Sequence, residues 1–370
     1  MLSKRKSRGL RGQFSRRPLP LWIVIIADVL VFGIALNVFA LFHHALPRRE
    51  ESLNIVSDRF QFVQAPEAEI AAPAMAPAPT PAGDAPTPEP SAMPAGDAPT
   101  PGPSETPEPT EAPEKDWVGH FGQKFATRFT DGEIIKDRHS YRSDTLSVTL
   151  AQRRYNKSNI YVADIYVKDI QQFKTAFAND TFGTGQYEWP RHICKRVDAV
   201  IAVNGDNYAA RQDGVVIRNG ELFKNRNASM DVCVIYWDGR METFRGRSFK
   251  AKDAIAAGAY QAWNFGPTLL DKNGAPLKHF TNTTVGDTNP RTVLGYFEPG
   301  HYCLVVVDGR SEDSVGLGFR SLAKLMSALG CKQAFNLDGG NTSMMVVGDT
   351  VISEPSEGGR ASSDIIYFVP

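Results

Sequence analysis

The sequence predicts an α+β fold, in which a mixed β-sheet domain with a few helices follows one transmembrane helix and a disordered linker. Three observations lead to this prediction: an apolar run near the amino terminus, a proline-rich stretch after it, and a remainder in which strand patterns outnumber helical ones. The expected divisions are a basic cytoplasmic tail at residues 1–20, an anchor at 21–42, a linker at 43–115 and a folded domain at 116–370.

The apolar run extends from Leu21 to Phe42 and is long enough to cross a bilayer at ~1.5 Å per residue. Asp28 lies within it, but the surrounding apolar side chains outweigh this one charge. The tail before the run is basic and contains no acidic residue, so the positive-inside rule places the amino terminus in the cytoplasm. We therefore expect a single-pass protein of the cell membrane with an extracytoplasmic domain, in preference to a cleaved signal peptide.

The linker is dominated by Pro, Ala, Thr, Glu and Gly from about residue 64 to 113, and it contains the motif PAGDAPTP twice. This composition has too little apolar surface to offset the entropy cost of ordering. In the polyproline II conformation, about 50 residues would reach on the order of 150 Å. The formal net charge of the chain is zero. Because the basic excess is confined to the tail, nucleic acid is not an expected partner.

The strands of the folded domain are predicted from apolar runs that end at polar turns. In chain order they fall within residues 158–170, where an offset in the alternation suggests a bulge, and within 197–208, 214–223, 229–246, 262–277, 291–309 and 364–370. Asn-Gly and Asp-Gly pairs inside several of these segments predict hairpins. Helices are expected at 171–178, around His192 and Cys194, at 252–259 and at 319–329.

A βαβ unit is predicted for residues 301–347. HYCLVVVDG and QAFNLDGG are typical of buried strands, and the helix between them has apolar residues at spacings of three and four before Gly330. If the strands are parallel and joined by a right-handed crossover, Asp308 and Asp338 leave the sheet at one edge. Two carboxylates, each followed by glycine, are candidates for acid, base or nucleophilic chemistry, although Asp-Gly is also a common turn sequence.

Polar turns at other strand ends supply amides, hydroxyls, an aromatic ring and guanidinium groups, which together are suited to hold a sugar and an anionic group. The candidates for substrate binding are Asn204, Gly205, Tyr208, Gly266, Arg291, Thr292, Arg310, Gly339, Gly340, Asn341, Thr342 and Ser343. Each of them, taken alone, also has a structural interpretation as a turn residue, a core ring or an ion-pair partner.

Neither CxxC nor HExxH occurs in the sequence, and the segment after Asp308 lacks the EF-hand pattern, so we predict no metal site and no cofactor. Outside the cell the cysteines could pair, but a domain of this size does not need disulfides and we favour buried thiols. The cysteines concerned are Cys194, Cys233, Cys303 and Cys331. The isolated histidines of the domain, interpreted as structural, include His192, His279 and His301.

Seven segments, taken in order, resemble the phosphodiester glycosidase family: NGDNY, GVVIRNG, NFGPTLL, NPRTVLGY, VVVDGRS, SLAKLMSALGC and FNLDGGNTSMM. The resemblance covers about residues 198–370 and rests on the order and spacing of these segments. The family usually continues Asp-Gly-Gly with Gly-Ser-Ser, where this chain has Asn341-Thr342-Ser343, and its first turn is commonly NGG with aromatic residues. These departures bear on the identity of the substrate more than on the class of reaction.

The resemblance implies hydrolysis of a glycosyl phosphodiester to a free sugar and a phosphomonoester, in a cell-surface glycan or exopolysaccharide. On this basis Asp308 and Asp338 are the first choice for a catalytic pair, and Asp206 is the reserve. Arg291, with Arg310 as second candidate, would neutralise the phosphate and make it a better leaving group. The alternative is a non-catalytic cell-wall or polysaccharide-binding module, which would keep the polar turns but would not need both aspartates.

Overall fold

The computed structural model describes residues 119–281 and 286–370, so the predicted tail, anchor and linker lie outside the described residues. Within this part of the chain, no helix is both long enough and apolar enough to cross a membrane. The described residues form three β-sheets of seven, five and five strands, together with α2 (Pro190–Arg196), α3 (Ala251–Ala256) and α4 (Phe319–Ala328).

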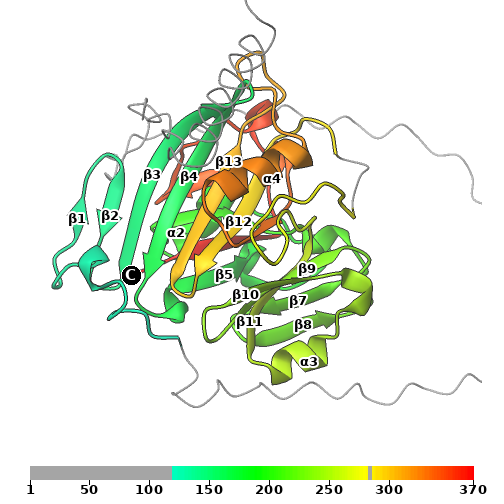
Figure 1. The fold of residues 1–370 in the computed structure, drawn as a ribbon, viewed down its shortest axis with the longest axis horizontal. Helices are drawn as coiled ribbons and strands as arrows, with labels where there is room; N and C mark the ends of the chain where they lie inside the picture. Colours follow the sequence, from blue (N-terminus) through cyan, green and yellow to red (C-terminus); the bar gives the residue numbers. More distant parts are fainter. Residues whose placement is uncertain (1–118, 282–285) are drawn as a thin grey trace, which may run out of the picture. The chain divides into compact units, whose positions relative to one another are not determined.

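The largest sheet has the strand order β1-β2-β3-β4-β13-β12-β14. Its strands are β1 (Ile135–Lys136), β2 (Ser140–Arg142), β3 (Leu146–Tyr155), β4 (Ser158–Val167), β12 (Arg291–Glu298), β13 (His301–Val307) and β14 (Gln333–Asn336). Both β13 and β14 pair with β12 in antiparallel register, so they run in the same direction with β12 between them. The predicted strand–helix–strand unit is therefore present, and α4 connects its two strands (Figure 1).

The second sheet has the order β10-β9-β11-β7-β8. Its strands are β7 (Val215–Arg218), β8 (Glu221–Asn225), β9 (Asp231–Tyr236), β10 (Met241–Phe244) and β11 (Ala259–Phe265). The turn between β7 and β8 has positive φ angles at Asn219 (52°) and Gly220 (90°). This is the two-residue hairpin turn that an Asn-Gly pair favours, and the prediction made from that pair is confirmed.

The third sheet has the order β16-β15-β6-β17-β5. Its strands are β5 (Phe173–Phe177), β6 (Ile201–Asn204), β15 (Met345–Val347), β16 (Thr350–Val351) and β17 (Asp364–Phe368). Short 3-10 helices lie at Ala126–Arg128, Ile170–Gln172, Ala178–Asp180, Tyr208–Ala210, Gly246–Ser248, Gly340–Thr342 and Ser356–Gly358. The α+β class is as predicted, but each ladder between neighbouring strands of the described residues is antiparallel rather than mixed.

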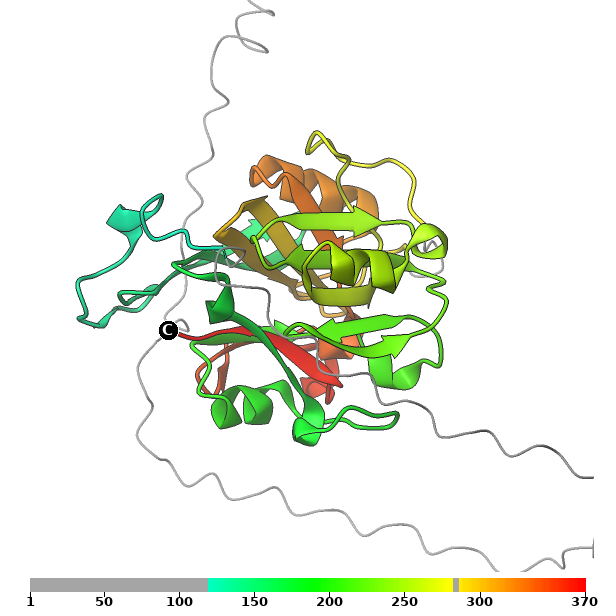
Figure 2. The same ribbon diagram turned by 90° about the horizontal axis from the view of Figure 1, so that it is seen from below.

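One hydrophobic core lies between the inner faces of all three sheets, and it includes Trp263, Tyr302 and Phe368. The outer face of each sheet is covered by one helix: α4 on the largest sheet, α3 on the second and α2 on the third (Figures 1 and 2). Central strands are therefore buried on both faces, which explains why β13 is a nearly continuous apolar run. The four cysteines are buried thiols, in agreement with the prediction.

Two local predictions are wrong. Residues 171–178 form the end of a 3-10 helix and then β5, because Phe173 and Thr175 point into the interior while β5 pairs with β17. The expected bulge within 158–170 is absent from β4, whose ladders with β3 and β13 are continuous. Its apolar residues do not alternate because both of its faces are covered, so the offset in the sequence did not mark a register change.

Candidate active site

Asp338 follows β14 at the edge of the largest sheet and is buried, with 7% of its surface exposed. The Thr342 hydroxyl donates to Asp338 Oδ2 at 2.7 Å, and Arg360 Nη2 donates to the same oxygen at 3.0 Å. Burial raises the pKa of Asp338, and the bonds from Thr342 and Arg360 oppose this increase without cancelling it. The result is a carboxyl group that keeps its proton to a higher pH than an exposed aspartate does, which is a property of general acids.

Asp308 follows β13 at the same edge and is also buried. Its Oδ1 accepts a hydrogen bond of 3.0 Å from the backbone N–H of Glu354. Because β12 lies between β13 and β14, the two aspartates follow strands that are roughly 10 Å apart, twice the usual interstrand spacing. This agrees with the prediction that both aspartates leave the sheet at one edge, and their catalytic role remains a prediction.

A single segment, residues 352–363 between β16 and β17, contacts both aspartates. Its Glu354 N–H bonds to Asp308, and its Arg360 bonds to Asp338. A third residue of the segment, Glu357, accepts a hydrogen bond of 2.7 Å from Asn341 Nδ2. Sequence reasoning missed this segment, because its only signal was an arginine and two glycines just before the last strand.

The backbone around Asp338 is held by the first predicted turn. Asn204 Nδ2 donates to the carbonyl oxygen of Asp338 at 2.8 Å, and its Oδ1 accepts from the Thr292 hydroxyl at 2.8 Å. The Asp338 N–H bonds to the carbonyl of Gly205. A side chain at Gly205 would collide with Asp364, whose nearest carboxylate oxygen lies 2.1 Å from the position of an added Cβ. The turn thus requires glycine and fixes the loop that carries Asp338.

Asn341 and Arg310 lie on the open side of this loop. Arg310 Nη1 donates to Asn341 Oδ1 at 2.8 Å, and its Nη2 donates to Asn289 Oδ1 at 3.0 Å. Gly340 has a φ of 67°, and a side chain there would meet the Arg310 guanidinium at 3.2 Å. The absence of a Cβ therefore lets the guanidinium approach the loop closely. Arg310 is exposed, and the Arg360 side chain is 54% exposed, so both remain accessible to an anion.

Arg291, unlike Arg310 and Arg360, is buried, with 3% of its surface exposed. Its guanidinium donates to the carbonyls of Leu317 at 2.9 Å and Asp287 at 2.7 Å, and it stacks 4.2 Å from the centre of the Phe319 ring. Burial lowers its pKa to about 10, so it stays charged at neutral pH. These contacts describe a cation that supports the loops around it, and its predicted role in binding phosphate is untested.

Asp206, the reserve catalytic residue, is fully buried with Arg218 and Asp364. Arg218 bonds to Asp206 Oδ1 at 2.9 Å and to Asp364 Oδ2 at 2.9 Å, and the Asn264 N–H bonds to Asp206 Oδ2 at 2.8 Å. Burial, with a smaller contribution from Asp206, raises the pKa of Asp364 to about 6, although Arg218 opposes the rise. This ion triad joins β7, β17 and the turn that follows β6.

The remaining candidates are placed as follows. Tyr208 is a core ring that stacks on Phe182, with centroids 5.1 Å apart. Gly266 precedes a cis-proline, and its backbone bonds to Asn336. The carbonyl oxygen of Gly339 is a second possible acceptor for the Thr342 hydroxyl at 2.7 Å, and Ser343 is buried. No group of three or more His, Cys, Asp or Glu in residues 119–281 and 286–370 is arranged to hold a metal ion.

The different exposure of Arg291, Arg310 and Arg360 predicts different effects of their substitution on substrate binding. We expect Arg310→Lys and Arg360→Lys to raise KM for a phosphodiester by roughly 10- to 100-fold, because lysine loses the bidentate geometry of the guanidinium. If Arg291 acts only through its loops, Arg291→Lys will lower the melting temperature and change KM much less. Steady-state kinetics and thermal melts of the three variants test this ranking, and a normal KM in both exposed variants would contradict it.

An α+β domain that gathers two buried carboxyl groups and two accessible arginines at one sheet edge has the components of a hydrolase that acts on an anionic glycan. Residues 198–369 match the family model described as phosphodiester glycosidase. The resemblance found in the sequence is thereby confirmed.

Three proteins illustrate the similarity. The "SPbeta prophage-derived uncharacterized protein YomE" of Bacillus subtilis (strain 168) is 32% identical over 186 residues, which are 48% of this chain and 29% of that protein. The chain thus spans less than a third of the length of this curated relative. The zebrafish N-acetylglucosamine-1-phosphodiester alpha-N-acetylglucosaminidase catalytic domain, auto-inhibited by its pro-peptide, is 19% identical with a TM-score of 0.49, over 61% of this chain and 83% of that one. A hypothetical protein from Synechocystis is 13% identical with a TM-score of 0.49, over 62% and 63%.

Proposed function

We propose that this domain hydrolyses glycosyl phosphodiesters in cell-surface glycans or exopolysaccharides, releasing a free sugar and a phosphomonoester. The observation that carries the proposal is the buried Asp338, whose pKa is raised and whose carboxylate is bonded to the accessible Arg360. A proton donor beside a cation is the combination that cleavage of a sugar–phosphate bond needs. The match of residues 198–369 to the phosphodiester glycosidase family model supports the same reaction.

In the proposed reaction, the bond between the anomeric carbon and the phosphate oxygen breaks and the oxygen of a water molecule is added to that carbon. Asp338 in its protonated form donates a proton to the departing phosphate oxygen, and Arg310 and Arg360 stabilise the charge that develops there. Asp308 acts as the second carboxylate, either by taking a proton from the water or by attacking the sugar first. The 352–363 segment holds both carboxylates in place.

The direct test is a turnover assay on the full chain purified in detergent. The methyl diester of N-acetylglucosamine-1-phosphate should yield free sugar and methyl phosphate, because its linkage is the one in the name of the zebrafish enzyme. The corresponding phosphomonoester and a neutral methyl glycoside serve as controls and should react much more slowly. Binding of the diester without sugar release would instead favour the non-catalytic polysaccharide-binding module.

The proposal places the domain outside the cell, anchored by residues 21–42. We expect protease added to intact cells or spheroplasts to degrade the domain and to leave the basic amino-terminal tail intact. An antibody against each end, with a cytoplasmic protein as the control for lysis, distinguishes the two fragments. Protection of the domain under conditions that digest a known surface protein would contradict this orientation.

A further inference from the structure

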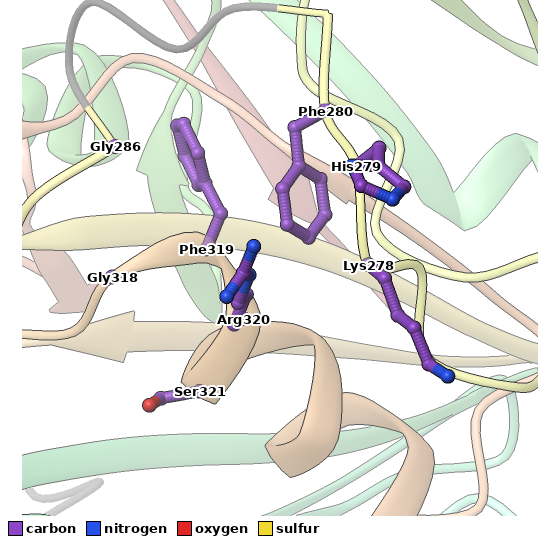
Figure 3. Close-up of a pocket in the computed structure, with 8 residues that line it drawn as sticks. All are labelled: Lys278, His279, Phe280, Gly286, Gly318, Phe319, Arg320 and Ser321. Carbon is purple, nitrogen blue, oxygen red and sulfur yellow. The ribbon is translucent and has the colours of Figure 1, made fainter.

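A second candidate site is a cavity of about 330 Å³ beside the start of α4. Figure 3 shows Lys278, His279 and Phe280 on the yellow loop along one side of it, and Phe319 and Arg320 at the beginning of the helix on the other. The volume lies at the lower end of the range for small-molecule sites, which is enough for one sugar ring with its phosphate. Neither the sequence motifs nor the reaction proposed above use this cavity.

The charge of the cavity is positive. Among its lining residues there are two permanent cations, Lys278 and Arg320, and no acidic side chain. Within residues 119–281 and 286–370 neither cation forms a salt bridge. Arg291 adds a third positive charge behind the Phe319 ring, 4.2 Å from its centre. An anion entering the cavity could therefore pair with Lys278 and Arg320 without displacing a carboxylate of the described residues.

The walls of the cavity also present an apolar surface. The rings of Phe280 and Phe319 have centroids 5.6 Å apart and an angle of 51° between their planes. Both rings line the cavity, but Phe319 is almost fully covered, with 3% of its surface exposed. The partly exposed Phe280 therefore provides the apolar face on which a ligand can rest while its anionic group reaches the cations. A sugar has such a face, whereas a bare inorganic anion would leave the rings unused.

The cavity is connected to the Asp338 loop through Asn289. The side chain of Asn289 accepts a hydrogen bond from Arg310, which also bonds to Asn341. Its backbone forms a bridge with Leu317, the residue before Gly318 on the cavity wall. The backbone and side-chain contacts of Asn289 thus link the cavity wall to the loop that carries Asp338.

We propose that the cavity binds the neighbouring sugar phosphate of a polymeric substrate, so that the domain recognises a chain of glycosyl phosphodiesters rather than a single unit. This inference rests on the proposed function for the nature of the chain. The Phe280 ring, which packs against Phe319, contacts the sugar, and Lys278 and Arg320 bind its phosphate. The site contributes to substrate affinity and takes no part in bond cleavage.

The test compares the Lys278→Ala/Arg320→Ala double variant with an Arg247→Ala/Lys252→Ala control in the full chain. The control removes one arginine and one lysine that are also exposed but lie at and near α3 on another sheet. The probe is a fluorescent oligomer of four N-acetylglucosamine-1-phosphate repeats, and its binding is measured in an Asp338→Asn background by anisotropy. A neutral tetrasaccharide and dextran sulfate are the reference ligands.

We expect the double variant to bind the oligomer about 5- to 20-fold more weakly, with a smaller ratio at high ionic strength, and the control variant to bind normally. Turnover of the single-unit diester is measured in chains that keep Asp338, and it should be unchanged by either pair of substitutions. Equal binding by the double variant, or an equal loss for dextran sulfate, would overturn the inference while leaving the proposed function intact. Weaker oligomer binding by the double variant, together with no diester cleavage by the chain that keeps Asp338, would support the cavity and refute the proposed function.

Discussion

Asp338→Asn is expected to leave the domain folded and to reduce kcat for a glycosyl phosphodiester by roughly 100- to 10,000-fold, the usual contribution of a general acid or base. Asparagine has the size of aspartate, and its side-chain oxygen can accept the bonds from Thr342 and Arg360. It has no proton to donate to the leaving phosphate. Circular dichroism and single-turnover kinetics on the same preparation separate loss of folding from loss of chemistry.

Asp308→Asn should show the same pattern, since its Oδ1 accepts a backbone N–H from Glu354 in the 352–363 segment and asparagine can keep that bond. Asp313→Asn, in the exposed loop that follows β13, is the matched control and should retain full activity. Asp206→Asn should lower the stability of the domain rather than its turnover, because Asp206 forms an ion pair with the buried Arg218. Two folded and fully active variants at positions 308 and 338 would show that the chemistry lies elsewhere.

Arg218→Met is expected to lower the free energy of unfolding by roughly 3–5 kcal/mol, the cost of leaving buried carboxylates without their counter-ion. Methionine fills much of the volume but satisfies neither Asp206 nor Asp364, both of which are fully buried. Burial by itself lowers the pKa of Arg218, but the two carboxylates outweigh it and raise that pKa. The guanidinium therefore stays charged at neutral pH. Urea denaturation followed by tryptophan fluorescence measures the change.

Asp364→Asn should lower the free energy of unfolding by less than Arg218→Met does. The pKa of Asp364 is raised to about 6, so its ionised form is less favourable in the folded protein than in the unfolded chain, and removing this charge also removes that unfavourable contribution. Arg226→Met, at an exposed position on the loop after β8, is the control and should change stability by less than about 0.5 kcal/mol. An Arg218→Met protein that unfolds at the same urea concentration as the wild type would refute a structural role for the triad.

Local sequence signals predicted much of this fold because they act over a few residues. The hairpin predicted from Asn219-Gly220 and the helix predicted from the apolar spacing in 319–329 are both present. Turn geometry and helix periodicity depend on residues that are near neighbours in the sequence. The prediction that Asp308 and Asp338 lie at one edge of the sheet followed from the common direction of the strands before them, β13 and β14. The helix predicted for residues 171–178 was wrong because β5 pairs with β17, nearly 200 residues away in sequence, and this pairing overrides the local helical pattern.

The sequence by itself determined the α+β class, the strand–helix–strand unit, the position of both aspartates and the resemblance of residues 198–369 to the phosphodiester glycosidase family. Only the tertiary structure decided which charged residues are buried and which remain accessible. Arg291 and Arg218 lie in the interior, while Arg360 reaches Asp338 from a loop 22 residues further along the chain. The physical reason is that the burial and the partner of a charged side chain depend on contacts between distant segments, which composition, spacing and periodicity do not encode.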